Sequence, residues 1–287
     1  MKILREVSMN STICSVTTTK DYIFTLGRRS HYDQTVHTIH VYDISTHDVK
    51  DVIPLKDSDP AWMAACNVAN CLYVGLRNKT SSYLSVFRIS RDAEQKFTMS
   101  PWIQDHRGCI SVMSVSANGN LIILSVQAGC PHVVSIYNAN GSLQHEIMLS
   151  PVLNVLSYMS VIQKSNGNVV LAYIREQSPQ VELLEIDTGG SIVRQYHSSM
   201  REGSYVNSAD VYGRIMITDQ TGGIELLDSE LNPLGTYSLL ENGIHLFEDL
   251  RYTGFNGEMN EIACIGFDKQ SQVKVLTVFR FAEEWTI

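Results

Sequence analysis

Residues 111–124 read SVMSVSANGNLIIL, and this stretch decides the fold because two β-rich runs flank an Asn-Gly pair. Asn118-Gly119 between such runs is a strong hairpin signal, since both residues tolerate positive φ. The same pair returns 48 residues later as Asn166-Gly167, in front of the apolar run 169–171. The sequence therefore predicts a β-hairpin that repeats along the chain.

Six short β-rich strings that end in a polar residue reveal the period of the repeat. They are Val41-Tyr42-Asp43, Val86-Phe87-Arg88, Ile136-Tyr137-Asn138, Glu185-Ile186-Asp187, Leu226-Leu227-Asp228 and Val278-Phe279-Arg280. Their middle residues lie 45, 50, 49, 41 and 52 residues apart, and the step from the last through the chain ends to the first is 50. A series that closes on itself is typical of a ring of repeats and not of an open solenoid.

Each repeat is expected to hold four strands. After the hairpin at 111–124, strand-like runs follow at 133–137 and 143–149, with Asn140-Gly141 between them. No window of eleven residues carries a convincing helical stripe. We therefore expect an all-β, closed six-bladed β-propeller with four-stranded blades, which forms a single domain over residues 1–287.

The last repeat contributes three strands, at 246–254, 261–267 and 273–281. Its fourth strand is expected to come from residues 3–9, so that the N-terminal strand joins the C-terminal blade and closes the ring. Closure of this kind leaves no free sheet edge between the first and last blades.

Charge and hydropathy exclude several classes of partner. The chain has a formal net charge of −8, and Arg28-Arg29 is its single adjacent basic pair, so nucleic-acid binding is not expected. No run of about 18 apolar residues is present, so no membrane role is expected either. The first residues lack the apolar segment of a secretory signal, which predicts a cytoplasmic location. We expect a monomer.

Six cysteines are too few, in a chain of 287 residues, for a disulfide scaffold. Cys66 and Cys71 flank a predicted hairpin tip at 67–70. A disulfide across this tip and a pair of buried thiols are both compatible with the sequence, and the pair of thiols is the simpler interpretation.

The chain resembles the NHL-like and WD40-like propellers that occur in invertebrate multidomain proteins. The likeness rests on the pattern at 63–66, 70–74, 109–112, 160–173 and 224–228, and it spans most of the chain. The Trp-Asp dipeptide of true WD40 blades is absent, because Trp62, Trp102 and Trp285 are followed by Met, Ile and Thr. The resemblance implies a recognition module, most often for proteins.

Binding residues are expected in two sets of loops that share one end of the blades. One set joins each blade to the next, and the other joins the second and third strands of a blade. Loops of variable length on a rigid scaffold are the usual carriers of binding. The candidate ligand-binding residues are Asp59, His106, Asn154, Asn207, Asp210, Glu248 and Asp249.

Two functions follow from these patterns. The first is a non-enzymatic recognition or scaffold propeller, without a cofactor, which binds a protein segment or a small ligand at one mouth of the ring. The alternative is a hydrolase or isomerase similar to the calcium-dependent lactonases, with its site in the central channel. Calcium takes six to eight oxygen ligands, and the partial site available to it comprises Asn207, Asp210, Glu248 and Asp249.

The expected inner strands argue against that alternative. One aligned position reads Ser15, Ala65, Ser114, Ser160, Asp210 and Leu250 through the six repeats. The position two residues earlier reads Ile13, Met63, Val112, Tyr158, Ser208 and Glu248. Each position offers one carboxylate, which is few for a calcium ion.

Overall fold

The computed structural model describes most of the chain as β-strands and tight turns. The described residues are 2–8, 12–31, 34–55, 59–77, 84–106, 109–126, 130–151, 153, 157–175, 178–201, 205–208, 213–219, 223–238, 252–256, 261–268 and 273–280. They form a β-propeller of four-stranded blades, each an antiparallel sheet of consecutive strands. The expected all-β propeller with four-stranded blades is confirmed. Among the described residues, no helix is long and apolar enough to cross a membrane.

Residues 57–202 form one compact unit with three blades. Blade 2 comprises β6 (Asp59–Cys66), β7 (Cys71–Arg77), β8 (Leu84–Arg91) and β9 (Phe97–His106). Blade 3 comprises β10 (Cys109–Val115), β11 (Leu121–Val126), β12 (Val133–Tyr137) and β13 (Leu143–Met148). Blade 4 comprises β14 (Ser157–Gln163), β15 (Val169–Arg175), β16 (Ser178–Ile186) and β17 (Ile192–Arg201).

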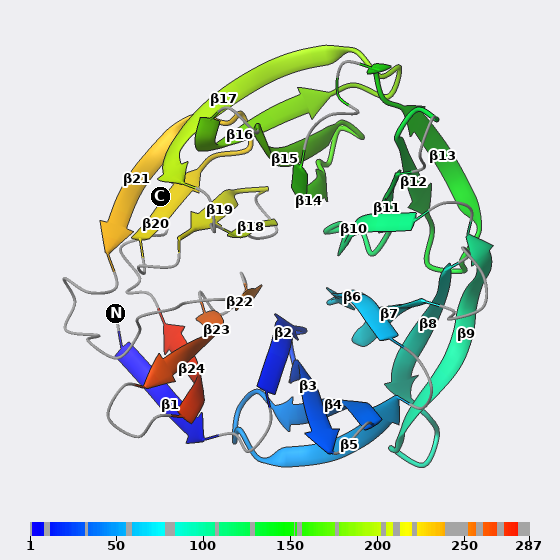
Figure 1. The fold of residues 1–287 in the computed structure, drawn as a ribbon, viewed down its shortest axis with the longest axis vertical. Coiled ribbons are helices and arrows are strands. Elements are labelled where there is room, and N and C mark those ends of the chain that lie inside the picture. Colours follow the sequence, from blue (N-terminus) through cyan, green and yellow to red (C-terminus); the bar gives the residue numbers. More distant parts are fainter. Residues whose placement is uncertain are drawn as a thin grey trace. The chain divides into compact units, whose positions relative to one another are not determined.

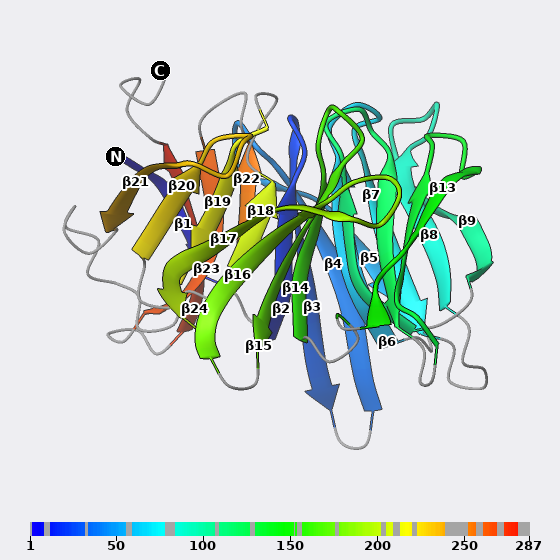
Figure 2. The same ribbon diagram turned by 90° about the horizontal axis from the view of Figure 1, so that it is seen from above.

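The other compact unit comprises residues 1–56 and 203–287. Blade 1 comprises β2 (Thr12–Thr18), β3 (Tyr22–His31), β4 (Gln34–Asp43) and β5 (Val49–Leu55). Blade 5 comprises β18 (Tyr205–Ser208), β19 (Ile215–Thr218), β20 (Gly223–Leu227) and β21 (Pro233–Ser238). The ten-residue strands β3 and β4 are longer than their neighbours, and their shared end projects at the bottom of Figure 2.

The two chain ends contribute strands to the same sheet of this unit. Its order is β1-β24-β23-β22, formed by β1 (Lys2–Ser8), β22 (Tyr252–Asn256), β23 (Glu261–Asp268) and β24 (Val273–Arg280). In the pairing of β1 with β24, Ile3 lies opposite Phe279. β22 begins later than the expected 246–254, and residues 239–251 lie outside the described part of the chain.

The central strands of blade 3 are apolar on both faces because this blade packs against blade 2 on one side and blade 4 on the other. In β11, Leu121 and Ile123 belong to the core between blades 2 and 3, whereas Ile122 and Leu124 belong to the core between blades 3 and 4. Successive side chains of a strand point to opposite faces, so a central strand buried on both faces needs no polar alternation. Each fully buried Leu or Ile stabilises the fold by roughly 1.5–3 kcal/mol.

Hydrogen bonds that span one repeat join the first strands of the blades in residues 57–202. The Trp62 Nε1–H of β6 donates to the Ile110 carbonyl of β10 at 3.3 Å. The Ser114 hydroxyl of β10 donates to the Val161 carbonyl of β14. β6, β10 and β14 therefore lie side by side, as Figure 1 shows.

The polar residue that ends each repeated string caps the turn between the third and fourth strands. In blade 4, Asp187 Oδ1 accepts the N–H groups of Gly189 at 2.9 Å and Ser191 at 2.8 Å. The equivalent turns of blades 1, 3 and 5 are capped by Asp43, Asn138 and Asp228. Asp and Asn favour such turns because their side chains replace a backbone acceptor. Blade 2 departs from the pattern, since its cap is Asp92, four residues after Arg88.

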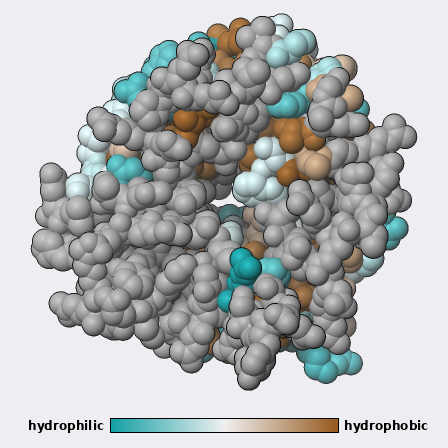
Figure 3. Space-filling view, in the orientation of Figure 1, coloured by the Kyte–Doolittle hydropathy of each residue, from teal (hydrophilic) through white to brown (hydrophobic). Residues whose placement is uncertain are grey.

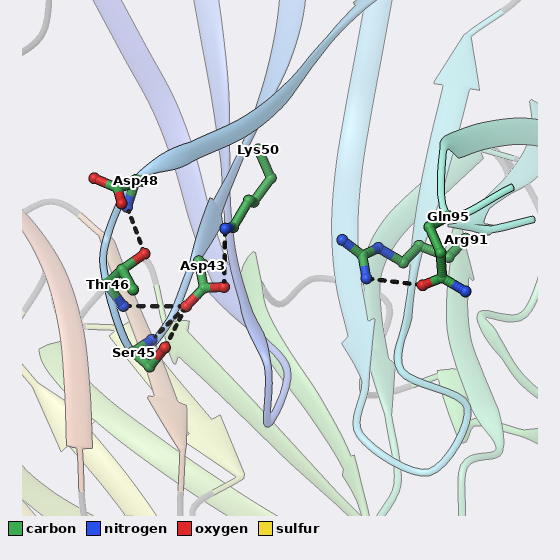
Figure 4. Close-up of polar contacts among 7 residues, drawn as sticks. All are labelled: Asp43, Ser45, Thr46, Asp48, Lys50, Arg91 and Gln95. Atoms are coloured by element: carbon green, nitrogen blue, oxygen red, sulfur yellow. Dashed lines mark hydrogen bonds and ion pairs between the residues drawn. The ribbon is translucent and has the colours of Figure 1, made fainter.

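The Asp43 cap is the most strongly hydrogen-bonded of these groups. Its Oδ1 accepts the Ser45 hydroxyl at 2.5 Å and the N–H groups of Ser45 and Thr46, and its Oδ2 lies 3.4 Å from Lys50 Nζ (Figure 4). These donors, the Ser45 hydroxyl first, hold the pKa of the Asp43 carboxyl well below its usual range. Figure 4 also shows Arg91, which donates to Gln95 Oε1 at 3.0 Å within the turn that Asp92 caps.

The capped turns of blades 2 to 5 have a left-handed residue three positions after the cap. It is Gly141 (φ +78°) in blade 3 and Gly190 (φ +88°) in blade 4. A Cβ on Gly190 would lie 2.7 Å from the Met148 carbonyl oxygen of β13, because the turn packs on the outer strand of blade 3. The predicted Asn-Gly hairpins are present too, but in them only the glycine takes a positive φ, as Gly119 and Gly167 do.

Replacing Gly190 by Ala is expected to cost more stability than replacing Gly167, whose φ of +90° is nearly the same. Both variants lose about 1–2 kcal/mol to left-handed strain. Gly190→Ala loses roughly 1 kcal/mol more, because its Cβ meets a carbonyl at 2.7 Å, whereas the Cβ of Gly167→Ala meets Thr188 Cγ2 at 3.6 Å. Urea unfolding of both variants measures the difference, and equal losses would contradict the packing of this turn on β13.

Candidate functional site

The two ends of each blade differ in the length of their connections. At one end of the blades in residues 57–202, the turns have four residues at 67–70 and five residues at 92–96, 116–120, 138–142, 164–168 and 187–191. At the other end, the connections within residues 57–202 range from two residues at 107–108 and 176–177 to six at 78–83 and 127–132 and eight at 149–156. We call the first the constant end and the second the variable end. Because neighbouring strands are antiparallel, both sets of expected binding loops lie at the variable end.

The structure describes few of the residues predicted to bind a ligand. Asp59 begins β6 at the variable end, and Asn207 lies in β18, but their side chains are outside the described part. Asn154, Asp210, Glu248 and Asp249 lie outside the described residues altogether. Their roles, including the partial calcium site, stay predictions.

His106 is the one candidate whose side chain the structure describes, and it differs from expectation. Instead of lying in a loop, it is the last residue of β9 and is buried against blade 3. Its Nε2 lies 2.5 Å from Ser125 Oγ of β11, and its Nδ1 lies 2.9 Å from the Tyr137 hydroxyl of β12. The Tyr137 ring also meets the imidazole edge to face, with centroids 6.1 Å apart.

The chain of hydrogen bonds continues toward the surface. Ser135, beside Tyr137 on the same blade, lies opposite Glu146 of β13, and its hydroxyl donates to Glu146 Oε1 at 3.4 Å. We call His106, Ser125, Ser135, Tyr137 and Glu146 the His106 network. Sequence reasoning missed Ser125 and Tyr137. The available signal was a hydroxyl inside the apolar run 121–126.

Burial holds the pKa of His106 below its ordinary value, and the charge of Glu146 offsets part of this effect. Burial likewise raises the pKa of the Tyr137 hydroxyl. A neutral imidazole has one N–H donor and one bare acceptor nitrogen, so one hydroxyl accepts from the ring and the other donates to it. Such a ring has the geometry to take a proton from Ser125. However, Ser125 is 7% exposed, and the network serves to join blades 2 and 3.

Blade 4 contains a second buried polar cluster. Glu182 Oε2 accepts the Tyr173 hydroxyl at 2.6 Å and Gln195 Nε2 at 3.0 Å. Glu185 pairs with Lys164 at 2.9 Å and accepts Asn168 Nδ2 at 2.7 Å. Burial raises the pKa of the Glu185 carboxyl, but the contacts with Asn168 and Lys164 together lower it by more. The pKa of Glu185 therefore lies below its ordinary value. Both carboxylates therefore bind partners within blade 4.

The described part of the inner strands carries small neutral residues. Ser15, Ala65, Ser114 and Ser160 occupy the aligned position, and the Ser114 hydroxyl is engaged by the next strand. Within the ranges that the structure describes, no three His, Cys, Asp or Glu side chains are grouped to hold a metal ion.

No model of a known protein family and no curated protein matches the chain. Among solved structures, the chain is similar to a protein of unknown function from Bacteroides caccae, with 12% sequence identity and a TM-score of 0.56. The match covers 81% of this chain and 80% of that one. At this identity the likeness concerns the fold alone.

Replacing His106 by Gln tests the burial of the neutral imidazole. Because the folded pKa is depressed, the unfolded chain takes up a proton first, so the stability of the native protein falls as pH drops below about 6.5, by up to roughly 1.4 kcal/mol per unit. His106→Gln keeps one donor and one acceptor and is expected to show a shallower decline between pH 7 and pH 5. Urea unfolding across this range measures both slopes. At pH 8 the imidazole is neutral in the folded and the unfolded chain, so the difference in free energy of unfolding between the two proteins does not include its titration. Equal slopes between pH 7 and pH 5 would contradict the burial of a neutral His106.

Proposed function

We propose that this chain is a closed six-bladed propeller of the NHL-like or WD40-like kind that acts as a non-enzymatic recognition module. It binds a protein segment, or else a small ligand, at the mouth formed by its variable end. We further propose that the protein is a cytoplasmic monomer that needs no cofactor and does not bind membranes. It is also proposed not to bind nucleic acid, in keeping with its net charge of −8.

The contrast between the two ends of the blades carries this proposal. At the constant end, the turns in residues 57–202 have four or five residues, and those between the third and fourth strands repeat a capping Asp or Asn and, in blades 3 and 4, pack on the neighbouring outer strand. The variable end has connections of two to eight residues between the same rigid blades in residues 57–202. Loops that differ in length on a rigid scaffold are where recognition residues concentrate.

The interior of residues 57–202 supports the same function. The buried carboxylates Glu182 and Glu185 and the imidazole of His106 are engaged by neighbouring side chains. Catalytic groups need a substrate within hydrogen-bond reach, whereas Glu182 and Glu185 face side chains of blade 4, and His106 faces side chains of blade 3. In Figure 3, the coloured residues of the face in view include both apolar (brown) and hydrophilic (teal) ones.

The sheet that contains strands from both chain ends supports the proposal of a sixth blade. β1 pairs with β24 over six residue pairs, and the string that ends in Arg280 is the sixth of the series. A propeller closed by its N-terminal strand has no free edge between its first and last blades.

Photo-crosslinking at two alanines of blade 3 tests where a partner binds. Ala128 lies in the connection between β11 and β12 at the variable end, and Ala139 lies in the turn between β12 and β13 at the constant end. With p-benzoylphenylalanine at either position of the full chain expressed in cells, we expect a discrete adduct from position 128, at least several-fold more abundant than from position 139. Mass spectrometry of the adducts measures the ratio, and an equal or reversed ratio would contradict binding at the variable end.

The hydrolase alternative gives a different outcome. If neither position yields an adduct, and calcium raises the Tm by several degrees in a way that EDTA reverses, the calcium-dependent enzyme is favoured. Loss of that shift in Asp249→Ala would assign the ion to the predicted partial site of Asn207, Asp210, Glu248 and Asp249.

Deleting residues 1–9 tests the closure. The deletion removes β1 and leaves the backbone of β24 without a partner along one edge, so a sharp fall in Tm is expected. Adding a synthetic peptide of residues 1–9 is expected to restore part of the loss, because the same edge is available to it. An unchanged melt after the deletion would refute the closed ring.

A further inference from the structure

Two cysteines face each other across the first hairpin of blade 2. Cys66 ends β6, Cys71 begins β7, and the two are register partners at the base of the tip 67–70. Facing residues of antiparallel strands have Cα atoms about 4.5–5.5 Å apart, which lies within the range that a disulfide bridges. In the structure both are free thiols, each fully buried.

The two thiols are arranged asymmetrically. The Ala69 N–H of the tip donates to Cys66 Sγ at 3.4 Å, and the Cys66 thiol lies 4.0 Å from the Gly119 carbonyl oxygen of blade 3. Within the part of the chain that the structure describes, no backbone N–H donates to Cys71 Sγ, and the next residue on the same face of β7 is the buried Tyr73. Negative charge is therefore better accommodated on Cys66 than on Cys71.

A cation lies beside this pair. Arg88 of β8 stacks over the Trp102 ring, with its guanidinium carbon 4.9 Å from the centroid, and Trp102 in turn contacts the Tyr73 ring at 5.6 Å. In the part of the chain that the structure describes, no carboxylate forms an ion pair with Arg88, and its Nε is buried without a hydrogen bond. A cation beside a thiol is the usual setting of a reactive cysteine.

These surroundings separate the pKa values of the two thiols. Contact with the Cys71 thiol, helped by the tip N–H groups and the Arg88 charge, lowers the pKa of Cys66. The same contact, together with burial, raises the pKa of Cys71. Cys66 is therefore the better nucleophile of the pair, and Cys71 is its protonated partner.

We propose that Cys66 and Cys71 are a peroxide-reactive dithiol that closes to a disulfide across the tip of the β6–β7 hairpin. The inference stands on the facing register of the two cysteines, the backbone N–H that donates to Cys66 Sγ and the Arg88 cation, which has no ion-pair partner among the described residues. It is independent of the recognition function, since none of these groups lies at the variable end.

The reaction is balanced by one molecule of a hydroperoxide. The Cys66 thiolate attacks one peroxide oxygen, the O–O bond breaks, and the leaving oxygen departs as water or an alcohol after taking a proton. Cys66 is then a sulfenic acid. The Cys71 sulfur attacks the Cys66 sulfur, the S–OH bond breaks, and the hydroxyl leaves as water with the Cys71 proton. The two thiols lose two electrons, and the peroxide gains them.

The path to the sulfur passes between two turns of the constant end. Val68, at the tip, is 63% exposed, and Gly119 of blade 3 lies against it, with Cys66 Sγ 3.5 Å from where a Gly119 Cβ would sit. A small oxidant such as hydrogen peroxide needs only a local separation of these two tips. A larger disulfide reagent needs the hairpin to open.

Trypsin places the two cysteines on one peptide, 57–77, and the exposed Cys109 and Cys130 on another, 108–164. After treatment of the native full chain with hydrogen peroxide and alkylation in denaturant, we expect peptide 57–77 to be lighter by two hydrogens and to resist alkylation. Peptide 108–164 is expected to react more slowly, by at least several-fold, and serves as the internal control. Reaction of Cys109 and Cys130 while Cys66 and Cys71 stay alkylatable would overturn the proposal.

Single variants identify the attacking sulfur. In Cys71→Ser, a sulfenic acid at Cys66 is expected to accumulate and to be trapped by dimedone. In Cys66→Ser, Cys71 is expected to give no adduct. Trapping at Cys71 alone would overturn the assignment of roles.

Arg88→Met tests the contribution of the cation and keeps an apolar stem over Trp102. Its disulfide is expected to form several-fold more slowly than in the wild type. The matched control is Arg91→Met, whose side chain lies over Phe97 on the same two strands at 5.4 Å and is expected to leave the rate unchanged. Equal rates in all three proteins would show that Arg88 does not activate Cys66 and would remove the charge argument.

Discussion

Burial of both faces of each blade is the constraint on which the rest of this structure depends. In β11, alternate side chains enter two different cores, so a six-residue strand is apolar almost throughout. A sheet buried on both sides has no solvent face on which to place charge. Polar groups inside must therefore find partners within the blades, as His106, Ser125 and Tyr137 do between blades 2 and 3.

The same constraint explains why one end of the blades is uniform. A turn that packs on the preceding outer strand has little room, and at Gly190 even a Cβ would meet the Met148 carbonyl. Left-handed φ, a capping carboxylate or amide and a fixed length of five residues satisfy the backbone there without extra volume. The connections at the variable end are not held to such a fixed length, and their lengths in residues 57–202 therefore differ.

Much of the fold was predictable because it depends on local pattern. The Asn-Gly hairpins, the four strands of a blade and the period of the strings all follow from residues close in sequence. The role of the polar residue at the end of each string was not predictable. That Asp187 caps a turn becomes evident only when the conformation of the turn is known. In blade 2 the sequence pattern points to the wrong residue. Arg88 ends the string, but the side chain that caps the turn is that of Asp92. The His106 network joins positions 106, 125 and 137, and only the packing of two blades brings them together.

The position of the Cys66–Cys71 pair separates it from recognition in physical terms. Its tip at 67–70 belongs to the constant end, where it contacts the next turn through Gly119 and Val68. A bond between facing residues at the base of a hairpin restrains the two strands that already pair there. It leaves the connection at 78–83, which follows the far end of β7, with the same length and anchors. Oxidation would thus act on the rigidity and opening of blade 2, and a partner at the variable end would meet the same loops in both redox states.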